Sequence, residues 1–443
     1  MEIGKIAIIG GGSPYIPMVL YSFAHCGGVF SGAEVCLMDI DGSRLPIIQA
    51  LGTNIAKDAK ADIKFTATTS LEEALSGSDF VISNFRAGGV ESLRLDEEIP
   101  VKYGVFGNET TGPGGTFYAL RSIPQTLNLC RSVEAICPDA WFINYTNPTN
   151  FVADAVRRKS KVKIIAVCDG GGNGLSHELA ASFGKRDGEV RLRCAGTNHP
   201  ANWIIDIQVG GEDGYPLLDQ HIIDEIAKAK KPEIRREFEF NAEIMETYGV
   251  YPANSVYLFP YFHHDEALAL FRSGCWSLYK TFMEELPAQW RRFEAVAKGE
   301  SLDLMDTTMH QTGTAHGDLS TKIIAAIATN KQTELHLNVP NEGAITNLPH
   351  GAIVEVPALI DAGGVKPLCM GKLPKGLRAL ASEIINWEEL TVDAALSGDR
   401  KMLLQALMAH PKWPVTYDKA GKICSEMLVA HSKYIPQFFS KNN

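Results

Sequence analysis

The sequence predicts an α/β fold, with a doubly wound parallel sheet followed by a mixed α+β C-terminal domain. Short apolar runs alternate with helical stretches through the first part of the chain, and this alternation is typical of a parallel sheet with right-handed crossover connections. A cluster of glycines directly follows the first apolar run. After about residue 190 the strand-like runs are no longer separated by helices. We therefore expect two domains, residues 1–190 and residues 191–443.

Six apolar runs are expected to form the strands of the parallel sheet. They span residues 5–9, 34–38, 63–66, 79–83, 140–144 and 163–167. Strands that are buried on both faces read as short, nearly continuous apolar runs, which is what these segments show. Helical stretches are expected around residues 18–25 and 71–75, and before each of the last two strands.

The second part of the chain is expected to mix strands and helices. Strand-like runs cover residues 190–194, 203–209, 334–339 and 352–356. Helical patterns cover residues 219–230, 234–247, 282–298 and 321–328, and they continue through the C-terminal part. This change of pattern favours an α+β domain that is distinct from the first half.

Composition and charge exclude several classes of protein. The chain has 443 residues, with 42 Lys and Arg against 52 Asp and Glu, which gives a formal net charge of −10. Nucleic acids and anionic membranes bind positive surfaces, so we expect neither as a partner. No apolar run approaches the ~18 residues of a membrane span, and Lys5 and the glycines interrupt the first apolar stretch, unlike a signal peptide. The nine cysteines lack tight pair spacing, so a cytoplasmic enzyme without a disulfide framework is expected.

A glycine cluster lies between the first strand and the first helix. Its residues are Gly10, Gly11, Gly12 and Ser13. Such a loop exposes backbone N–H groups and a helix N-terminus to a pyrophosphate, as in Rossmann-type domains. Tyr15 replaces the last glycine of the usual motif, so a tight turn of another α/β fold stays an alternative. Asp39 ends the second strand, where an acid binds the ribose hydroxyls of NAD rather than NADP.

Further polar residues follow the later strands of the predicted sheet. Asn147 precedes a proline after the strand at 140–144, and Cys168 and Asp169 close the next strand before three glycines. Ligands bind at the carboxyl ends of parallel strands, so Cys168 is a candidate soft metal ligand and Asp169 a candidate proton donor. Each of these features also has a purely structural interpretation when it is taken singly. Cys168 would then be a small core residue, His199 would be a structural histidine, and the region of Tyr257 would be an aromatic core.

In their order along the chain, these segments resemble glycoside hydrolase family 4, the NAD- and divalent-metal-dependent glycosidases. The resemblance rests on seven motifs in family order. They are residues 6–13, 37–41, 96–115, 143–148, 167–169, 196–199 and 252–261. Seven ordered motifs are far more specific than any one of them.

The resemblance implies roles for individual residues. Cys168 and His199 would bind the metal, usually Mn²⁺, with sugar hydroxyls completing its coordination. Asp169 would be the general acid and Tyr257 the base. Glu109 and Asn147 would contact the substrate. Arg94 and Arg272 would also contact it, because they lie nearest to the arginine positions of phospho-specific relatives.

The residue after the metal-binding cysteine varies with substrate class in this family. Asp at this place resembles the 6-phospho-α-glucosidases, so a 6-phospho-α-glucoside is the expected substrate. Three glycines follow Asp169 where those relatives carry Met-Pro, and a non-phosphorylated or uronic α-glycoside is the alternative. We further expect a small-molecule glycoside as the only partner besides other copies of the chain, in a homodimer or homotetramer.

The resemblance also implies a reaction course. NAD⁺ takes a hydride from C3 of the sugar, the metal polarises the oxygens on C2 and C3 as a Lewis acid, and Tyr257 removes the C2 proton. The leaving group then departs from C1 with Asp169 as the acid, water adds, and the hydride returns to C3.

Two other functional classes share parts of this pattern. An NAD-dependent 2-hydroxyacid dehydrogenase has the same nucleotide-binding half, but it would not use the pair of Cys168 and His199. A regulatory module that senses NAD would need neither Tyr257 nor a metal. Release of free sugar with no net NADH would distinguish the glycosidase from both.

Overall fold

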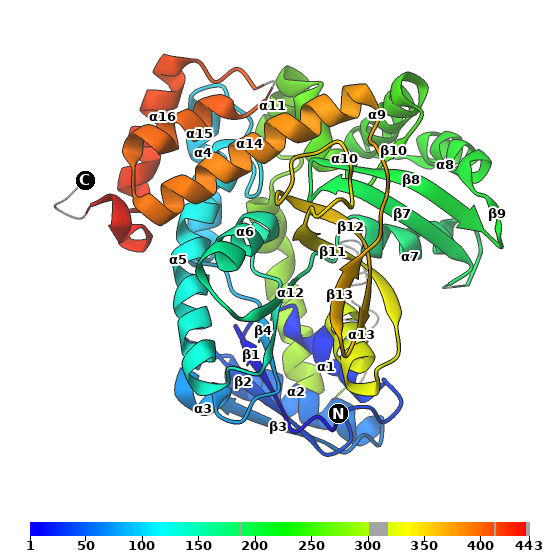
Figure 1. Ribbon diagram of the computed structural model, residues 1–443, viewed down its shortest axis with the longest axis vertical. Helices are drawn as coiled ribbons and strands as arrows, with labels where there is room; N and C mark the ends of the chain where they lie inside the picture. The colour runs from blue at the N-terminus through cyan, green and yellow to red at the C-terminus, as the bar shows by residue number, and fades with distance from the viewer. Residues whose placement is uncertain (187, 301–317, 412, 440–443) are drawn as a thin grey trace.

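The first part of the chain folds into the parallel sheet that its apolar runs predict. The computed structural model describes residues 1–186, 188–300, 318–411 and 413–439 (Figure 1). Its parallel strands are β1 (Lys5–Ile9), β2 (Ala33–Met38), β3 (Ile63–Thr68), β4 (Phe80–Ser83), β5 (Trp141–Asn144) and β6 (Lys163–Ala166). They lie in the order β3-β2-β1-β4-β5-β6. This is the strand order of dinucleotide-binding Rossmann sheets, and it confirms the predicted fold class.

The strand order reverses between β1 and β4. These two strands pair in parallel from Ile6↔Phe80 to Ile9↔Ser83. The connection after β1 and the connection after β4 run to opposite faces of the sheet. A crevice is therefore left between them at the carboxyl ends of the two strands. The glycine cluster follows β1 and Asn84 follows β4, so both lie at this crevice.

Helices connect the parallel strands, as the alternating pattern predicts. They are α1 (Ile16–Ala24), α2 (Leu45–Asp58), α3 (Leu71–Leu75), α4 (Gly89–Lys102), α5 (Gly112–Ile136) and α6 (Thr149–Lys159). The next helix, α7 (Gly172–Ser182), leads from β6 to the second part of the chain. The apolar side chains of Ile6, Ala7 and Ile8 on β1 are fully buried, because β1 lies in the interior of the sheet, between β2 and β4.

The second part of the chain extends the same sheet with antiparallel strands. Its strands are β7 (Val190–Thr197), β8 (Ala201–Val209), β9 (Glu212–Asp213), β10 (Tyr251–Pro252), β11 (Thr333–Pro340), β12 (Ile353–Asp361) and β13 (Gly364–Pro367). β11 joins the parallel part at Asn338↔Ala166, and β12 joins β7 at Glu355↔Gly196. One sheet therefore runs through both predicted domains, and the boundary at residue 190 stays a prediction.

Helices of the second part pack on this extension and on the parallel half of the molecule. They are α8 (Tyr215–Lys228), α9 (Pro232–Tyr248), α10 (Ser255–Leu258), α11 (His264–Ser273), α12 (Leu278–Ala297), α13 (Asp318–Thr329), α14 (Lys375–Ser397), α15 (Arg400–Ala409) and α16 (Tyr417–Ala430), with 3-10 turns η1 (Phe259–Tyr261), η3 (Ser432–Tyr434) and η4 (Pro436–Phe438). The long α14 crosses the front of the molecule and packs on α5 and α6 (Figure 1). α12 packs on α2 and α4, so it links the two halves of the chain.

Two neighbouring carboxylates of α4 hold other helices in place. Asp96 is fully buried and forms an ion pair with Arg121 of α5 at 2.5 Å, and His431 lies 3.1 Å from the same carboxylate. Glu97 accepts hydrogen bonds from the Ser277 hydroxyl, at 2.6 Å, and from the first backbone N–H of α12, at 2.9 Å. The orphan donors at the start of α12 are thereby satisfied, and both carboxylates serve the scaffold.

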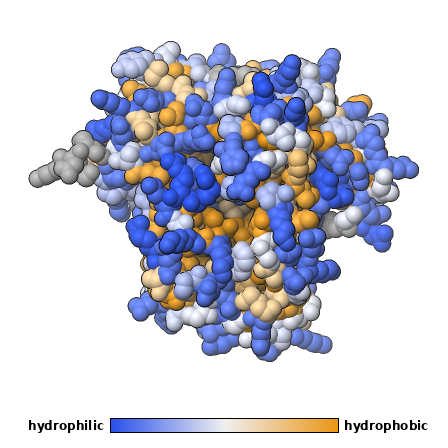
Figure 2. Space-filling view, in the orientation of Figure 1, coloured by the Kyte–Doolittle hydropathy of each residue, from blue (hydrophilic) through white to orange (hydrophobic). Residues whose placement is uncertain are grey.

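The face of the molecule in Figure 2 is mostly polar, with a local exception. Apolar side chains reach the surface in the middle of the face that Figure 2 shows, between its upper and lower parts. On α16, Tyr417 and Val429 are also largely exposed. Among the described residues, no helix combines the length and the apolar character that crossing a bilayer requires.

Candidate active site

The glycine cluster folds tightly against the ends of β2 and β4. The N–H groups of Gly10 and Gly11 both donate to the carbonyl of Met38, at 2.9 and 2.8 Å. A Cβ at Gly10 would lie 2.1 Å from the carbonyl oxygen of Asn84, and the φ of Gly10 is +92°. Only glycine fits this conformation and this close approach. The loop therefore leaves its backbone open to a ligand at the start of α1.

Asp39 reaches back to this loop. Its Oδ2 accepts a hydrogen bond from the N–H of Gly12 at 3.1 Å, and its Oδ1 accepts one from the N–H of Asp41. Ser13 lies one turn before α1 and accepts from the N–H of Tyr15 at 3.4 Å. A glycine loop, a helix start and a carboxylate thus meet at the crevice, and this donor set fits the pyrophosphate and ribose of a dinucleotide.

Cys168 and His199 are brought together by two different loops. Their Sγ and Nε2 atoms lie 3.5 Å apart. Burial lowers the pKa of His199 to about 4, so the imidazole is neutral at pH 7 and has the form that binds metals. Burial, followed by the charge of Glu355, raises the pKa of the Cys168 thiol to about 12, so metal binding would have to displace its proton.

The pair fits a divalent metal with open coordination positions. Among the described residues, no group of three or more His, Cys, Asp and Glu side chains is placed to hold an ion. A thiolate and an imidazole therefore supply two ligands, and further positions would be left for oxygen ligands from a substrate. His199 itself adopts a left-handed backbone conformation, with φ of +67°, which costs energy at a non-glycine residue.

Tyr257 lies directly against this pair. The rings of His199 and Tyr257 are stacked, with centroids 4.4 Å apart and planes inclined by 16°. Tyr257 belongs to the short helix α10, and its neighbours Phe259 and Tyr261 are buried in the core. Burial, and then the charges of Glu109 and Cys168, raise the pKa of Tyr257 well above its usual value. The aromatic segment therefore divides between the core and the candidate site.

Glu109 forms an ion pair with Arg86, a residue that our sequence analysis missed. Arg86 lies in the loop after β4, and Nη1 of its guanidinium bonds Oε2 of Glu109. The guanidinium also lies over the rings of Tyr118 and Phe282, 5.0 and 5.7 Å from their centroids. A cationic residue directly after an apolar strand, at the carboxyl edge of the sheet, was a signal in the sequence that could have found it.

Asp169 and Tyr15 complete the group. Asp169 follows Cys168 and is buried, with an exposed fraction of 8%. Tyr15 is half-buried, and desolvation raises the pKa of its phenol to about 12, while the charge of Arg86 lowers it and the charges of Glu109 and Asp169 raise it. Tyr15, Arg86, Glu109 and Asp169 are therefore within electrostatic reach of each other, and Tyr15 is a second residue that the sequence analysis did not assign.

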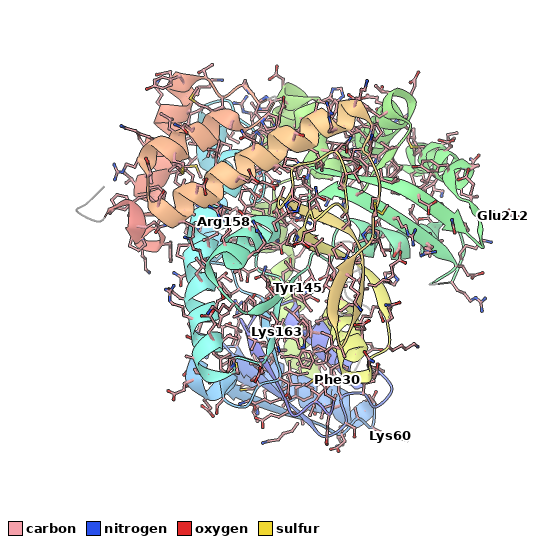
Figure 3. The ribbon with its side chains drawn as sticks, viewed as in Figure 1. Phe30, Lys60, Tyr145, Arg158, Lys163 and Glu212 are labelled. Atoms are coloured by element: carbon pink, nitrogen blue, oxygen red, sulfur yellow. The ribbon has the colours of Figure 1, made fainter. Side chains whose placement is uncertain are left out.

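Asn147 lies at the same edge of the sheet. Its backbone carbonyl accepts a hydrogen bond from Ser122 at 2.7 Å, and its side chain is partly exposed. Tyr145, the first residue after β5, lies in the middle of the molecule (Figure 3). Its hydroxyl accepts a hydrogen bond from the N–H of Ser320 at 2.7 Å. The start of α13 is thus tied to the loop that carries Asn147.

Arg94 and Arg272 lie elsewhere in the described part of the chain. Arg94 forms ion pairs of 2.5 Å with Glu91 and Glu98 of its own helix. Arg272, in the last turn of α11, donates to the carbonyl of Val101 at 3.4 Å. The structure therefore does not group either guanidinium with Cys168, His199 and Tyr257. Their predicted contact with the substrate stays a prediction.

The fold and this site together define a class of protein. The Rossmann sheet carries a glycine loop, and the antiparallel extension joined to it supplies His199 of the Cys–His pair. This is the arrangement of a nucleotide- and metal-dependent α/β enzyme. Comparison with known families identifies it further. The model of the family 4 glycosyl hydrolases matches residues 5–183, and the model of their C-terminal domain matches residues 194–413. The chain therefore belongs to glycosyl hydrolase family 4, as its motifs predict.

Similar proteins cover nearly the whole chain. A probable 6-phospho-beta-glucosidase of Bacillus subtilis is 31% identical, with 99% of this chain and 98% of that protein covered. A 6-phospho-alpha-glucosidase of Lacticaseibacillus paracasei is 31% identical, with 98% of both covered. A crystal structure of a 6-phospho-alpha-glucosidase from gut microorganisms, in complex with NAD and Mn²⁺, has a TM-score of 0.86 and 27% identity, covering 98% of this chain and 99% of its own.

Proposed function

We propose that this glycosidase hydrolyses a 6-phospho-α-glucoside with the help of NAD and a divalent metal. The observation that carries the proposal is the approach of Cys168 to His199, at 3.5 Å, beside the stacked ring of Tyr257. The similar proteins support the phosphorylated sugar, since they include 6-phospho-glucosidases of both anomeric classes. The carboxylate of Asp169 beside the thiol supports the α-anomer, through the resemblance noted above.

The cofactors are assigned to different sets of residues. The loop from Gly10 to Ser13 would bind the pyrophosphate of NAD, and Asp39 its ribose hydroxyls. Cys168 and His199 would bind the metal, and Mn²⁺ is supported by the similar structure with NAD and Mn²⁺. When bound, NAD accepts and returns a hydride at C3 of the sugar, and the metal polarises the oxygens on C2 and C3.

The chain itself moves the protons. Tyr257 would take the proton from C2 in its ionised form, because its ring is fixed against His199 next to the metal pair. The charge of a bound metal would offset the burial that raises the pKa of this phenol. Asp169 would give a proton to the glycosidic oxygen from a buried position beside Cys168. Glu109 and Asn147 would hold sugar hydroxyls. Burial of Glu109 and Asp169 excludes bulk water from them and strengthens their hydrogen bonds to the substrate.

Arg86 would recognise the anionic group of the sugar. Within the described residues, its guanidinium has one hydrogen-bonded partner, Glu109, although it carries five N–H donors. The guanidinium lies close enough to Tyr15 for its charge to lower the pKa of that phenol. A phosphate or carboxylate on C6 is the ligand that such a planar donor group binds best. Arg94 and Arg272 stay candidates for the same role until they are tested.

Labelling at C2 tests the reaction, and a substrate series tests the specificity. Hydrolysis in D₂O is expected to place deuterium at C2 of the released sugar without net formation of NADH. A product without deuterium would refute removal of the C2 proton. For specificity, kcat/KM is compared for the p-nitrophenyl α-glucoside, its 6-phosphate, the β-anomer of that phosphate and the α-glucuronide. We expect the α-linked 6-phosphate to give the highest value.

We also propose that the enzyme acts in the cytoplasm as a homodimer or homotetramer. The apolar area in the middle of the face in Figure 2 supports an association between copies, because large apolar areas on a soluble protein commonly mark interaction sites. Light scattering coupled to size-exclusion chromatography measures the assembly, and a monomer at micromolar concentration would contradict the proposal.

A further inference from the structure

A buried carboxylate lies directly behind the Cys168–His199 pair. Glu355 belongs to β12 and has an exposed fraction of 1%. Its Oε2 accepts a hydrogen bond of 2.5 Å from the side-chain amide of Asn198, the residue before His199. The amide of Asn198 also lies near Cys168, because it lowers the pKa of that thiol. Glu355 is therefore one hydrogen bond away from the loop of His199, and the amide that it holds lies next to Cys168.

The same carboxylate also meets the loop that follows Cys168. Its Oε1 is buried and has no hydrogen-bond partner among the described residues. A Cβ at Gly171 would lie 2.8 Å from Oε1 of Glu355, and the φ of Gly171 is +62°. The loop after β6 thus passes so closely over Glu355 that a side chain at Gly171 would collide with the carboxylate.

His336 explains the next glycine of that loop. A Cβ at Gly172 would lie 2.5 Å from the His336 ring. That ring is fixed, because its Nε2 accepts from the backbone N–H of Cys194 at 3.0 Å. Gly171 and Gly172 are therefore required by two side chains from β12 and β11, and they do not signal a loose loop.

Burial of Glu355 needs a compensating reason. Among the described residues, no Lys, Arg or His forms an ion pair with it, and its hydrogen-bond donor is the neutral amide of Asn198. A carboxylate in such surroundings costs free energy of folding. β11 and β12 come from far along the chain, yet they meet β6 and β7 at the residues Ala166 and Gly196, just before the two candidate metal ligands.

We propose that Glu355 is a positioning residue for the metal site. Its carboxylate accepts from Asn198 in the loop of His199 and lies directly against Gly171 in the loop of Cys168, and so fixes the distance between the thiol and the imidazole. This inference rests on the proposed metal role of the Cys–His pair. Residues that orient metal ligands from behind commonly change metal affinity by 10- to 100-fold when they are replaced.

The test compares the metal affinity of Glu355→Gln with that of the wild type. Calorimetric titration of each full chain with MnCl₂, in the presence of NAD⁺, gives the Kd for Mn²⁺. We expect the Kd to rise about 10- to 100-fold in Glu355→Gln, while the Kd for NAD⁺ stays within about twofold. Glu334→Gln is the matched control, since Glu334 pairs with Arg191 and Arg193 on β7 and its loss should leave the Kd for Mn²⁺ unchanged.

A spectroscopic readout separates positioning from general loss of stability. Co²⁺ bound to the wild-type chain should show a thiolate charge-transfer band from Cys168, and the band should weaken or shift in Glu355→Gln at a temperature where both chains are folded. Unchanged Kd and an unchanged band in folded Glu355→Gln would overturn the inference. Failure of the wild type to bind either metal would instead refute the proposed metal site.

A second variant covers the case in which Glu355→Gln does not fold. Asn198→Ala removes the amide between Glu355 and Cys168 but leaves the carboxylate in place. We expect a similar loss of Mn²⁺ affinity, and in the double variant the two losses should not add, because both break one connection. An Asn198→Ala chain with the wild-type Kd would contradict the proposal.

Discussion

The imidazole of His199 stacks on the phenol ring of Tyr257, with 4.4 Å between the centroids and 16° between the planes. The proposed metal ligand and the proposed base therefore fix one another. His199 comes from the turn between β7 and β8, whereas Tyr257 comes from α10. Because a near-parallel contact restricts both rings, the oxygen of Tyr257 and the ring nitrogens of His199 keep a constant relation.

Replacing Tyr257 should separate proton transfer from metal binding. Tyr257→Phe keeps the stacked ring but removes the hydroxyl, so kcat should fall about 10²- to 10⁴-fold while the Kd for Mn²⁺ stays within about twofold. Tyr257→Ala also removes the ring and should weaken Mn²⁺ binding. Steady-state kinetics and calorimetry measure the two effects. A Tyr257→Phe enzyme with the wild-type kcat would exclude Tyr257 as the base.

Removing the metal or its thiol ligand should abolish activity. Excess EDTA should inactivate the wild type, and Mn²⁺ should restore it, whereas Cys168→Ser should stay inactive at any Mn²⁺ concentration. Cys275→Ser is the control, because Cys275 is a partly exposed residue after α11 that accepts a hydrogen bond from Ser273. Thiolate ligands are prone to oxidation, so we also expect a reductant to preserve activity. Full activity in EDTA would contradict the metal assignment.

Arg86 should set the preference for an anionic sugar. Arg86→Gln is expected to lower kcat/KM for the p-nitrophenyl α-glucoside 6-phosphate by about 100-fold or more, with a much smaller change for the unphosphorylated sugar. Arg131→Gln on the exposed face of α5 is the control. Arg94→Gln and Arg272→Gln, assayed in parallel, test the other two candidate arginines.

Arg86→Gln also leaves Glu109 without its partner, so a further variant is needed. In Arg86→Gln with Glu109→Gln, the two neutral amides can still hydrogen-bond without an unpaired buried charge. The phosphate preference should stay lost in this double variant. An equal loss on phosphorylated and unphosphorylated substrates would mean that Arg86 serves the reaction or the fold, and not the recognition of the anion.

Glu97 should make stability depend on pH. Burial raises the pKa of Glu97 from 4.5 to about 7 in the folded chain. Between these values the folded chain binds more protons than the unfolded chain, so this carboxyl group removes stability as the pH rises through that window. Glu97→Gln lacks this dependence. The free energy of unfolding of Glu97→Gln, minus that of the wild type, should therefore rise by up to about 3 kcal/mol from pH 5 to pH 8.

Denaturant unfolding at both pH values measures this difference. Glu98→Gln is the matched control, since Glu98 is the next residue of α4 and lies half-exposed in an ion pair with Arg94. A stability difference between Glu97→Gln and wild type that is the same at pH 5 and pH 8 would show that Glu97 keeps an ordinary pKa in the folded chain.

Local sequence patterns were sufficient for the strands of the parallel sheet and for the glycine loop. The run at residues 34–38 became β2, which begins one residue earlier, and the helix expected at 219–230 became α8, which begins at Tyr215. Apolar runs and glycines are local signals, because burial on both faces and positive φ angles restrict residue type position by position. The motifs also identified the family, which the comparison confirms.

The sequence by itself thus determined the Rossmann half, the family and the residue types of the candidate site. Only the tertiary structure decided which residues meet there. It paired Arg86 with Glu109 and placed Glu355 behind Asn198, and it left Arg94 on the surface of α4. Glu355 and Asn198 are separated by 157 positions, and no local pattern records such a contact. It exists because β11 and β12 complete the sheet between β6 and β7, and that pairing is fixed by packing of the whole chain.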